Sequence, residues 1–145
     1  MTGRILGLDV GDRTVGVAAS DALLMTAQGV ETIRRTTLKK DLARLDELMR
    51  EYDASCLVVG LPRNMNGTEG ERCEVVRAFA DAIQAARPDA EIVFRDERLS
   101  TVAASKSLIA ADVSRKKRRQ VIDKMAAVFI LQGYLDGLSM KRAEA

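Results

Sequence analysis

The 145-residue sequence contains no histidine. This absence excludes zinc sites of the HExxH type, Ser-His-Asp triads and Cys-His dyads, because each of these sites needs an imidazole. If the chain is an enzyme, its chemistry has to come from carboxylates, Lys, Arg, Tyr, Ser or Thr, a thiol, or a bound metal ion.

Cysteine and aromatic residues are also scarce. Cys56 and Cys73 lack CxxC spacing, and two cysteines cannot build a disulfide scaffold. Cys56 lies in an apolar run, which favours a buried structural thiol over a nucleophile. With two tyrosines, three phenylalanines and no tryptophan, the base-stacking surfaces of RRM or OB domains are not expected.

Long hydrophobic runs are missing as well. No run approaches the ~18 apolar residues of a membrane span, and the N-terminus lacks the apolar stretch and cleavage site of a secretory signal. A hydrophobic content of 47% is nevertheless too high for a disordered chain. We therefore expect one cytoplasmic domain over residues 1–145, with no membrane partner.

The net charge of +2 conceals an uneven distribution. Residues 113–145 hold 8 basic and 3 acidic residues, whereas residues 1–112 hold 15 basic and 18 acidic residues. One run explains the excess, and it is either a solvated connector or a surface that contacts nucleic-acid phosphates without reading bases. The run is Arg115, Lys116, Lys117, Arg118 and Arg119.

Five apolar segments have the length and composition of β-strands. The first two are joined by the short connector at 11–13, which predicts a hairpin with antiparallel pairing. The later strands alternate with helices, which predicts an α/β domain with a mixed sheet covered by helices. The expected strands cover residues 4–10, 14–20, 29–34, 56–60 and 91–95.

Four segments have the spacing or the end signals of helices. In the second of them, Thr68 and Glu71 form a capping box, and Arg87-Pro88 ends the helix. Its expected apolar face consists of Val75, Val76, Phe79, Ile83 and Ala86. The expected helices cover residues 38–52, 68–86, 100–111 and 120–138.

Two acidic residues follow apolar strands. Asp9 lies between Leu8 and Val10, where an ionised carboxylate needs a cation or hydrogen-bond donors. A turn aspartate that caps the hairpin is an equally good interpretation of Asp9. Glu97 follows the strand at 91–95, and it is either solvated or, if the strands are parallel, at the same sheet end as Asp9.

A third acidic residue interrupts an apolar helix surface. Asp123 shares one helical stripe with Ala127, Ile130 and Tyr134. It is either a first-turn acid stabilised by the helix dipole or a ligand directed toward the strand ends.

Three carboxylates from two strand ends and one helix suggest a common chemistry. Asp9, Glu97 and Asp123 would hold hard divalent cations, Mg²⁺ or Mn²⁺, while leaving coordination positions for phosphate. Two such ions activate water and stabilise the leaving oxygen without any histidine. The pattern therefore predicts metal-dependent hydrolysis of phosphodiesters. Three loop residues beside this site are candidate phosphate clamps: Arg13, Arg63 and Arg98.

Five sequence blocks in this order resemble the YqgF family, also called RuvX, of bacterial RuvC-like nucleases. The blocks are GLDVG at 7–11, VGVA at 15–18 with SD at 20–21, VGLP at 59–62 with NMNGTEG at 64–70, DERLST at 96–101, and IDKMAA at 122–127 with ILQ at 130–132.

The resemblance implies an RNase H-like fold, with a five-stranded mixed sheet of order 3-2-1-4-5 and helices on both faces. It also implies a cytoplasmic nuclease that matures the 5′ end of pre-16S rRNA, with Holliday-junction resolution as the competing assignment. Asp9, Glu97 and Asp123 map onto the acidic positions expected for the metal site.

One feature departs from the wider superfamily. Many of its members carry an acid on the strand next to the first one, but here that strand, at 56–60, ends in Leu61-Pro62. Glu97 would have to reach across from the edge strand, so the number of metal ions, one or two, stays open.

Other function classes remain possible at this point. GLDVG at 7–11 also resembles the phosphate loop of actin- and Hsp70-type ATPases, although those proteins need two such domains to enclose ATP. A non-catalytic assembly factor would use only the fold and the basic run. The substrate is structured RNA or branched DNA, and a two-fold-symmetric junction would call for a homodimer, whereas an RNA end would not.

Overall fold

The computed structural model describes residues 3–64, 66–97 and 115–144, with only the helix backbone for residues 115–123 and 142–144. The strands are β1 (Ile5–Val10), β2 (Thr14–Ser20), β3 (Ala27–Arg34), β4 (Cys56–Leu61) and β5 (Glu91–Asp96). The helices in this part of the chain are α1 (Leu38–Glu51), α2 (Glu71–Ala86) and α4 (Arg115–Glu144).

The sheet has the strand order β3-β2-β1-β4-β5, which confirms the predicted topology. β1 pairs antiparallel with β2 and parallel with β4, and β4 pairs parallel with β5. The predicted hairpin is closed by the Gly11 backbone N–H, which donates to the Thr14 carbonyl at 2.8 Å. Because β1, β4 and β5 run in the same direction, their carboxyl ends meet at one edge of the sheet.

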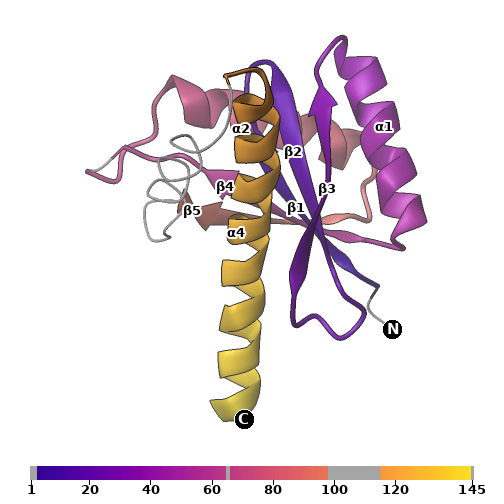
Figure 1. The fold of residues 1–145 in the computed structure, drawn as a ribbon, viewed down its shortest axis with the longest axis vertical. Helices are drawn as coiled ribbons and strands as arrows, with labels where there is room; N and C mark the ends of the chain where they lie inside the picture. Colours follow the sequence, from indigo (N-terminus) through magenta and orange to yellow (C-terminus); the bar gives the residue numbers. More distant parts are fainter. Residues whose placement is uncertain (1–2, 65, 98–114, 145) are drawn as a thin grey trace.

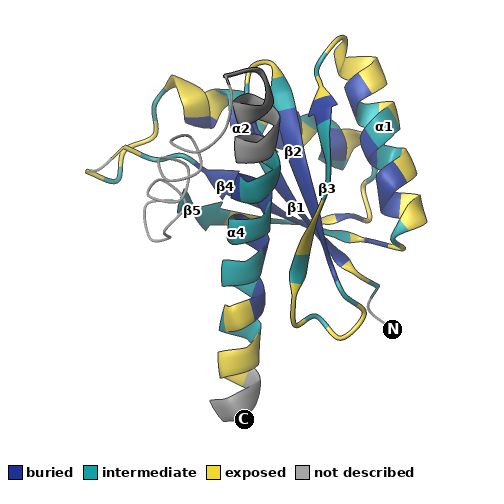
Figure 2. Cartoon of the chain, viewed as in Figure 1, coloured by how far each residue is buried: buried dark blue, intermediate teal, exposed yellow. Residues whose placement is uncertain are grey.

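Helices cover both faces of the sheet, as expected (Figure 1). The alternation of side chains along β1 sends Leu6, Leu8 and Val10 into the core with α1 and α2. Ile5 belongs to the second core, which is formed with α4. Figure 2 shows that the buried positions follow the strands and the inner side of each helix.

α4 lies unusually close to β1. A Cβ built on Gly7 would lie 2.7 Å from the Leu131 Cβ and 2.9 Å from the Ala127 carbonyl oxygen. Glycine is thus required at position 7 to let the helix approach the strand. Ile5, at the beginning of β1, lines a pocket with Tyr134. The earlier residues of α4 therefore lie toward the carboxyl end of β1.

The basic run lies inside α4, not before it. The helix begins at Arg115 and ends at Glu144, whereas the sequence predicted residues 120–138. Lys and Arg are good helix formers, and neither glycine nor proline separates the run from the apolar segment. At 30 residues, α4 is roughly 45 Å long. No helix in the described parts of the chain is long and apolar enough to cross a membrane.

The predicted capping box is wrong. The Thr68 hydroxyl bonds to Asn66 and Asn64 at 2.6 and 3.0 Å, and thereby closes the loop before α2. Short polar side chains in a turn compete for such a hydroxyl. α2 begins at Glu71, and its N-cap is Gly70, which has no capping side chain.

The remaining differences are smaller. Ala86 is exposed, not part of the apolar face of α2, because it lies in the last turn. Cys73 and Ala80 are buried in that helix instead. β3 begins two residues before the predicted strand, and the expected helix at 100–111 lies outside the described residues.

A buried acid holds the β1–β2 hairpin against the helices. Asp41 is 3% exposed and accepts from the Arg35 guanidinium at 3.3 Å and from the Thr36 N–H at 3.1 Å. Arg35 also donates to the Gly11 carbonyl at 2.8 Å and lies over the Phe79 ring at 4.9 Å. One guanidinium therefore joins the hairpin to both α1 and α2.

Replacing Asp41 with alanine should destabilise the fold. Asp41→Ala leaves the Arg35 guanidinium without its carboxylate, so we expect the free energy of unfolding to fall by about 2–3 kcal/mol. Urea denaturation measures this change. Glu47→Ala is the control on the same helix, because Glu47 is 64% exposed and its pair with Arg44 is worth less than about 1 kcal/mol. Equal losses in the two variants would contradict the role of Asp41.

Candidate active site

Asp9 lies near the carboxyl end of β1, on the face covered by α4. It is half-buried, and it alternates with Gly7 and Ile5, which both face α4. Its antiparallel partner on β2 is Gly16. On the other side, Val59 of β4 pairs with Leu8, so the next residue, Gly60, lies beside Asp9. A glycine therefore flanks Asp9 on each neighbouring strand.

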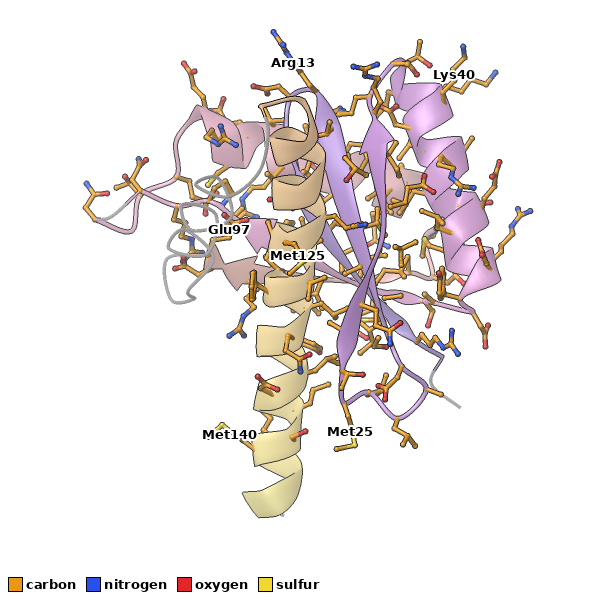
Figure 3. All side chains as sticks on the ribbon, viewed as in Figure 1. Arg13, Met25, Lys40, Glu97, Met125 and Met140 are labelled. Atoms are coloured by element: carbon orange, nitrogen blue, oxygen red, sulfur yellow. The ribbon has the colours of Figure 1, made fainter. Side chains whose placement is uncertain are left out.

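Glu97 directly follows β5 and reaches back over the sheet. A Cβ built on Gly60 would overlap with the Glu97 Oε1 and with the Ile130 Cδ1 of α4. The Glu97 carboxylate consequently lies over β4, at the position beside Asp9, next to α4 (Figure 3). The structure thus brings Asp9 and Glu97 to the same end and the same face of the sheet.

Asp123 belongs to the first half of α4. It comes one helical turn before Ala127 and two turns before Ile130, but its side chain lies outside the described residues. Within the described residues no group of three His, Cys, Asp or Glu side chains could hold a metal ion. Two of the three predicted carboxylates are therefore placed, and the role of Asp123 remains a prediction.

Arg63, one of the predicted phosphate clamps, lies beside Asp96, the residue before Glu97. Its guanidinium lies 3.6 Å from the Asp96 carboxylate and 3.8 Å from that of Glu69. The Arg63 Nε is buried and has no hydrogen-bond partner among the described residues. Ion pairs thus hold Arg63 at the edge of the site, and its Nε–H donates no hydrogen bond to the described residues.

The other predicted cations are less well placed. Arg13 is exposed at the tip of the β1–β2 hairpin, and Figure 3 shows it directed away from Glu97. Arg98 lies outside the described residues. The five residues of the basic run occupy the beginning of α4, but their side chains are not described. Their contacts with phosphate remain predictions.

Sequence reasoning overlooked Gly16 and Gly60. Neither has a positive φ in the structure, so no turn requires glycine there. Glycine inside a strand loses side-chain packing and marks a place where another group approaches closely. An isolated glycine within each apolar strand was the signal that could have identified these positions.

The structure agrees with the interpretation of Cys56 as a structural thiol. Cys73 is fully buried, and Cys56 is half-buried with a pKa that burial raises to about 11. At neutral pH the Cys56 thiol is protonated and therefore a poor nucleophile. This leaves oxygen ligands, not sulfur, at the centre of the candidate chemistry.

Comparison with known proteins identifies the family. A sequence profile described as "RuvX: Holliday junction resolvase" matches residues 3–137. The chain belongs to the RuvX family. A relative from Moorella thermoacetica, named "Putative pre-16S rRNA nuclease", is 60% identical over 93% of this chain and 96% of its own length. A relative of the same name from Desulforamulus reducens is 59% identical over 92% and 96%, respectively.

Solved structures agree with the fold of this RuvX chain. The Thermus thermophilus RuvC bound to a Holliday junction has a TM-score of 0.63 and 14% identity, with 94% of this chain and 96% of RuvC covered. The fowlpox virus resolvase has a TM-score of 0.54 and 9% identity, with coverage of 93% and 98%. Both likenesses show that the fold is that of RuvC-like, RNase H-like proteins, as predicted.

The two thiols should be almost inert in the folded protein. At pH 8 a pKa of about 11, against an ordinary value of 9.0, leaves roughly a hundredfold less Cys56 thiolate. We expect iodoacetamide to alkylate Cys56 correspondingly slowly, with a rate that rises with pH up to about 11. Peptide mass spectrometry measures both cysteines, and urea-unfolded protein is the control. Rapid alkylation of Cys56 at pH 7 would contradict this environment.

Proposed function

We propose that this chain is a metal-dependent endonuclease that hydrolyses phosphodiester bonds in the 5′ precursor segment of 16S rRNA. One observation carries the proposal. The Glu97 carboxylate lies over Gly60, beside Asp9, at the carboxyl end of the parallel strands. In open α/β sheets, this end is where ligands bind.

The residues present fit a divalent cation. Carboxylate oxygens are the ligands that Mg²⁺ and Mn²⁺ prefer, and the sequence has no imidazole that would favour zinc. Asp9 and Glu97 would hold one ion, and Asp123 would complete a site for one or two ions. When bound, such an ion lowers the pKa of a coordinated water and stabilises charge on the leaving oxygen.

The protein's own contribution is to position the substrate. Gly16 and Gly60 place no side chain of their own beside Asp9, and over Gly60 this allows the Glu97 carboxylate to approach. The Arg63 guanidinium, which lies 3.6 Å from the Asp96 carboxylate and is partly exposed, would supply charged donors for a phosphate oxygen at the edge of the site. Arg13, Arg98 and the basic run would hold the nucleic-acid backbone farther from the reacting bond.

The relatives favour RNA as the substrate. Two relatives at 59–60% identity, each aligned over at least 92% of this chain, carry the name of a pre-16S rRNA nuclease. The family description instead names Holliday-junction resolution, so cleavage of branched DNA is the second candidate. We propose a cytoplasmic enzyme that cuts RNA; cleavage of a two-fold-symmetric junction would call for a homodimer, whereas cleavage at an RNA end would not.

Removing either placed carboxylate should abolish cleavage and leave binding intact. Asp9→Asn and Glu97→Gln each remove one metal ligand, so we expect the cleavage rate to fall at least about a hundredfold. Labelled precursor rRNA and a four-way DNA junction are each incubated with Mg²⁺, Mn²⁺ or EDTA, and products are resolved on denaturing gels. Asp12→Asn, an acid-to-amide change at the exposed hairpin tip, is the matched control.

The outcomes separate the candidate functions. Cleavage of RNA alone supports the proposal, and cleavage of the junction alone replaces it with the resolvase function. Undiminished cleavage by Asp9→Asn would contradict the assignment of the metal site. Absence of cleavage on both substrates, with tight binding of RNA, would instead favour a non-catalytic assembly factor.

The basic run should govern the salt dependence of binding. The logarithm of the association constant for nucleic acid falls linearly with the logarithm of the salt concentration, and each phosphate contact steepens this slope by about 1. Replacing all five residues at 115–119 with alanine removes such contacts and should make the slope shallower. A helix turns once in about 3.6 residues, so we expect about 2–3 of the five to face the substrate. Fluorescence anisotropy at several salt concentrations measures the slope.

Two other exposed cations provide the control for that experiment. Lys39 and Lys40 lie in the first turn of α1, which packs on the opposite face of the sheet from α4 (Figure 3). Their replacement by alanine should leave the slope unchanged. Equal effects of the two sets would show that binding depends on overall charge and not on the basic run.

A further inference from the structure

The position of Glu97 poses a geometric problem. Neighbouring strands lie roughly 4.8 Å apart, so β5 and β1 are separated by roughly 9.6 Å with β4 between them. A carboxylate that starts at the end of β5 can approach Asp9 only by crossing above β4. Any side chain on that face of β4 would lie in its path.

The residue at the crossing point is Gly60. It pairs with Arg95, two residues before Glu97, and it follows the residue that pairs with Leu8. The rest of β4 is apolar and packs closely, and Val58, the preceding residue on the same face, is fully buried. Gly60 is therefore the one point along this crossing where the strand presents no side chain.

The space above Gly60 is already filled by two groups. A Cβ there would overlap with the Glu97 Oε1 and the Ile130 Cδ1, and it would lie 3.1 Å from the Ile130 Cγ1. The carboxylate is the end of a flexible side chain, whereas Ile130 is 1% exposed and lies in the hydrophobic core between α4 and the sheet. An added methyl group would consequently displace the carboxylate before it displaced the helix.

We propose that Gly60 is a positioning residue for metal binding, because its missing side chain is what allows the Glu97 carboxylate to lie beside Asp9. This inference rests on the proposed function, since it assigns Gly60 a role toward the same metal site. Gly60 itself supplies no ligand. It acts only through Glu97.

The first test measures Mn²⁺ binding by calorimetry, which does not depend on cleavage. Gly60→Ala should weaken Mn²⁺ binding at least about tenfold while the variant stays folded, as judged by urea denaturation. Ile130→Val, which removes the overlapping Cδ1 and nothing else, is the control and should bind Mn²⁺ like the wild type. If Gly60→Ala does not fold, the double variant Gly60→Ala/Ile130→Val is used, because it removes the overlap between the new methyl group and the Ile130 Cδ1. Its Mn²⁺ affinity should still be lower than that of the wild type.

A double-mutant cycle separates this role from general damage to the sheet. Glu97→Asp withdraws the carboxylate by one methylene, so an added methyl group at position 60 should matter less. The loss of Mn²⁺ affinity caused by Gly60→Ala is measured in the wild type and again in the Glu97→Asp variant. We expect this fold-loss to be at least about threefold smaller in the Glu97→Asp variant. Equal factors would show that Gly60 acts independently of Glu97 and would overturn the inference.

The two proposals fail in different ways. If the wild type binds no Mn²⁺ and cuts neither substrate, the proposed function fails and the inference falls with it. If the wild type binds Mn²⁺ and cleaves, but folded Gly60→Ala binds Mn²⁺ equally well, only the role of Gly60 is wrong.

Discussion

The close packing of α4 on the sheet is the contact on which the rest of the structure depends. Gly7 permits it, because any side chain at that position would overlap with the helix backbone. The helix then completes the second core, with Ala127 and Leu131 fully buried above the strands. It also places the Ile130 Cδ1 over Gly60, where the Glu97 Oε1 lies as well. One contact between helix and strand thus serves both the stability of the fold and the shape of the candidate site.

The parallel pairing of β1, β4 and β5 is the second constraint. It brings residues that are 88 positions apart in the sequence, Asp9 and Glu97, to one edge of the sheet. A glycine lies beside Asp9 on each neighbouring strand, and the Glu97 carboxylate occupies the space over one of them, Gly60. β4 carries no acid at this edge, and the Glu97 carboxylate, which follows β5, lies over Gly60 instead.

The charge distribution follows the same division of the chain. Asp9 and Glu97 lie at the carboxyl end of the central strands, and the basic run begins α4, whose earlier residues lie toward that same end of β1. A helix that starts at Arg115 carries its cations on a fixed element and not on a loose connector.

Alternating apolar residues and the short connector at 11–13 predicted most of the elements and the hairpin, and the structure confirms them. The strand order, which the structure also confirms, was implied by the family resemblance of the five sequence blocks. The ends of helices were less predictable. Thr68 bonds within its own loop instead of capping α2, and nothing local in the sequence stops α4 from extending back to Arg115. Such ends depend on competition between nearby polar groups, which spacing does not reveal.

For the site, the residues themselves determined which chemistry is available, since a chain without histidine has only oxygen ligands for a hard cation. The sequence also indicated that Glu97 would have to reach across β4. Only the tertiary structure decided how this happens, by placing Gly60 under the carboxylate and Ile130 beside it. The physical reason is that the role of a glycine depends on which groups occupy the space that a side chain would fill. At Gly60 these groups belong to residues 37 and 70 positions farther along the chain, so the local sequence does not reveal them.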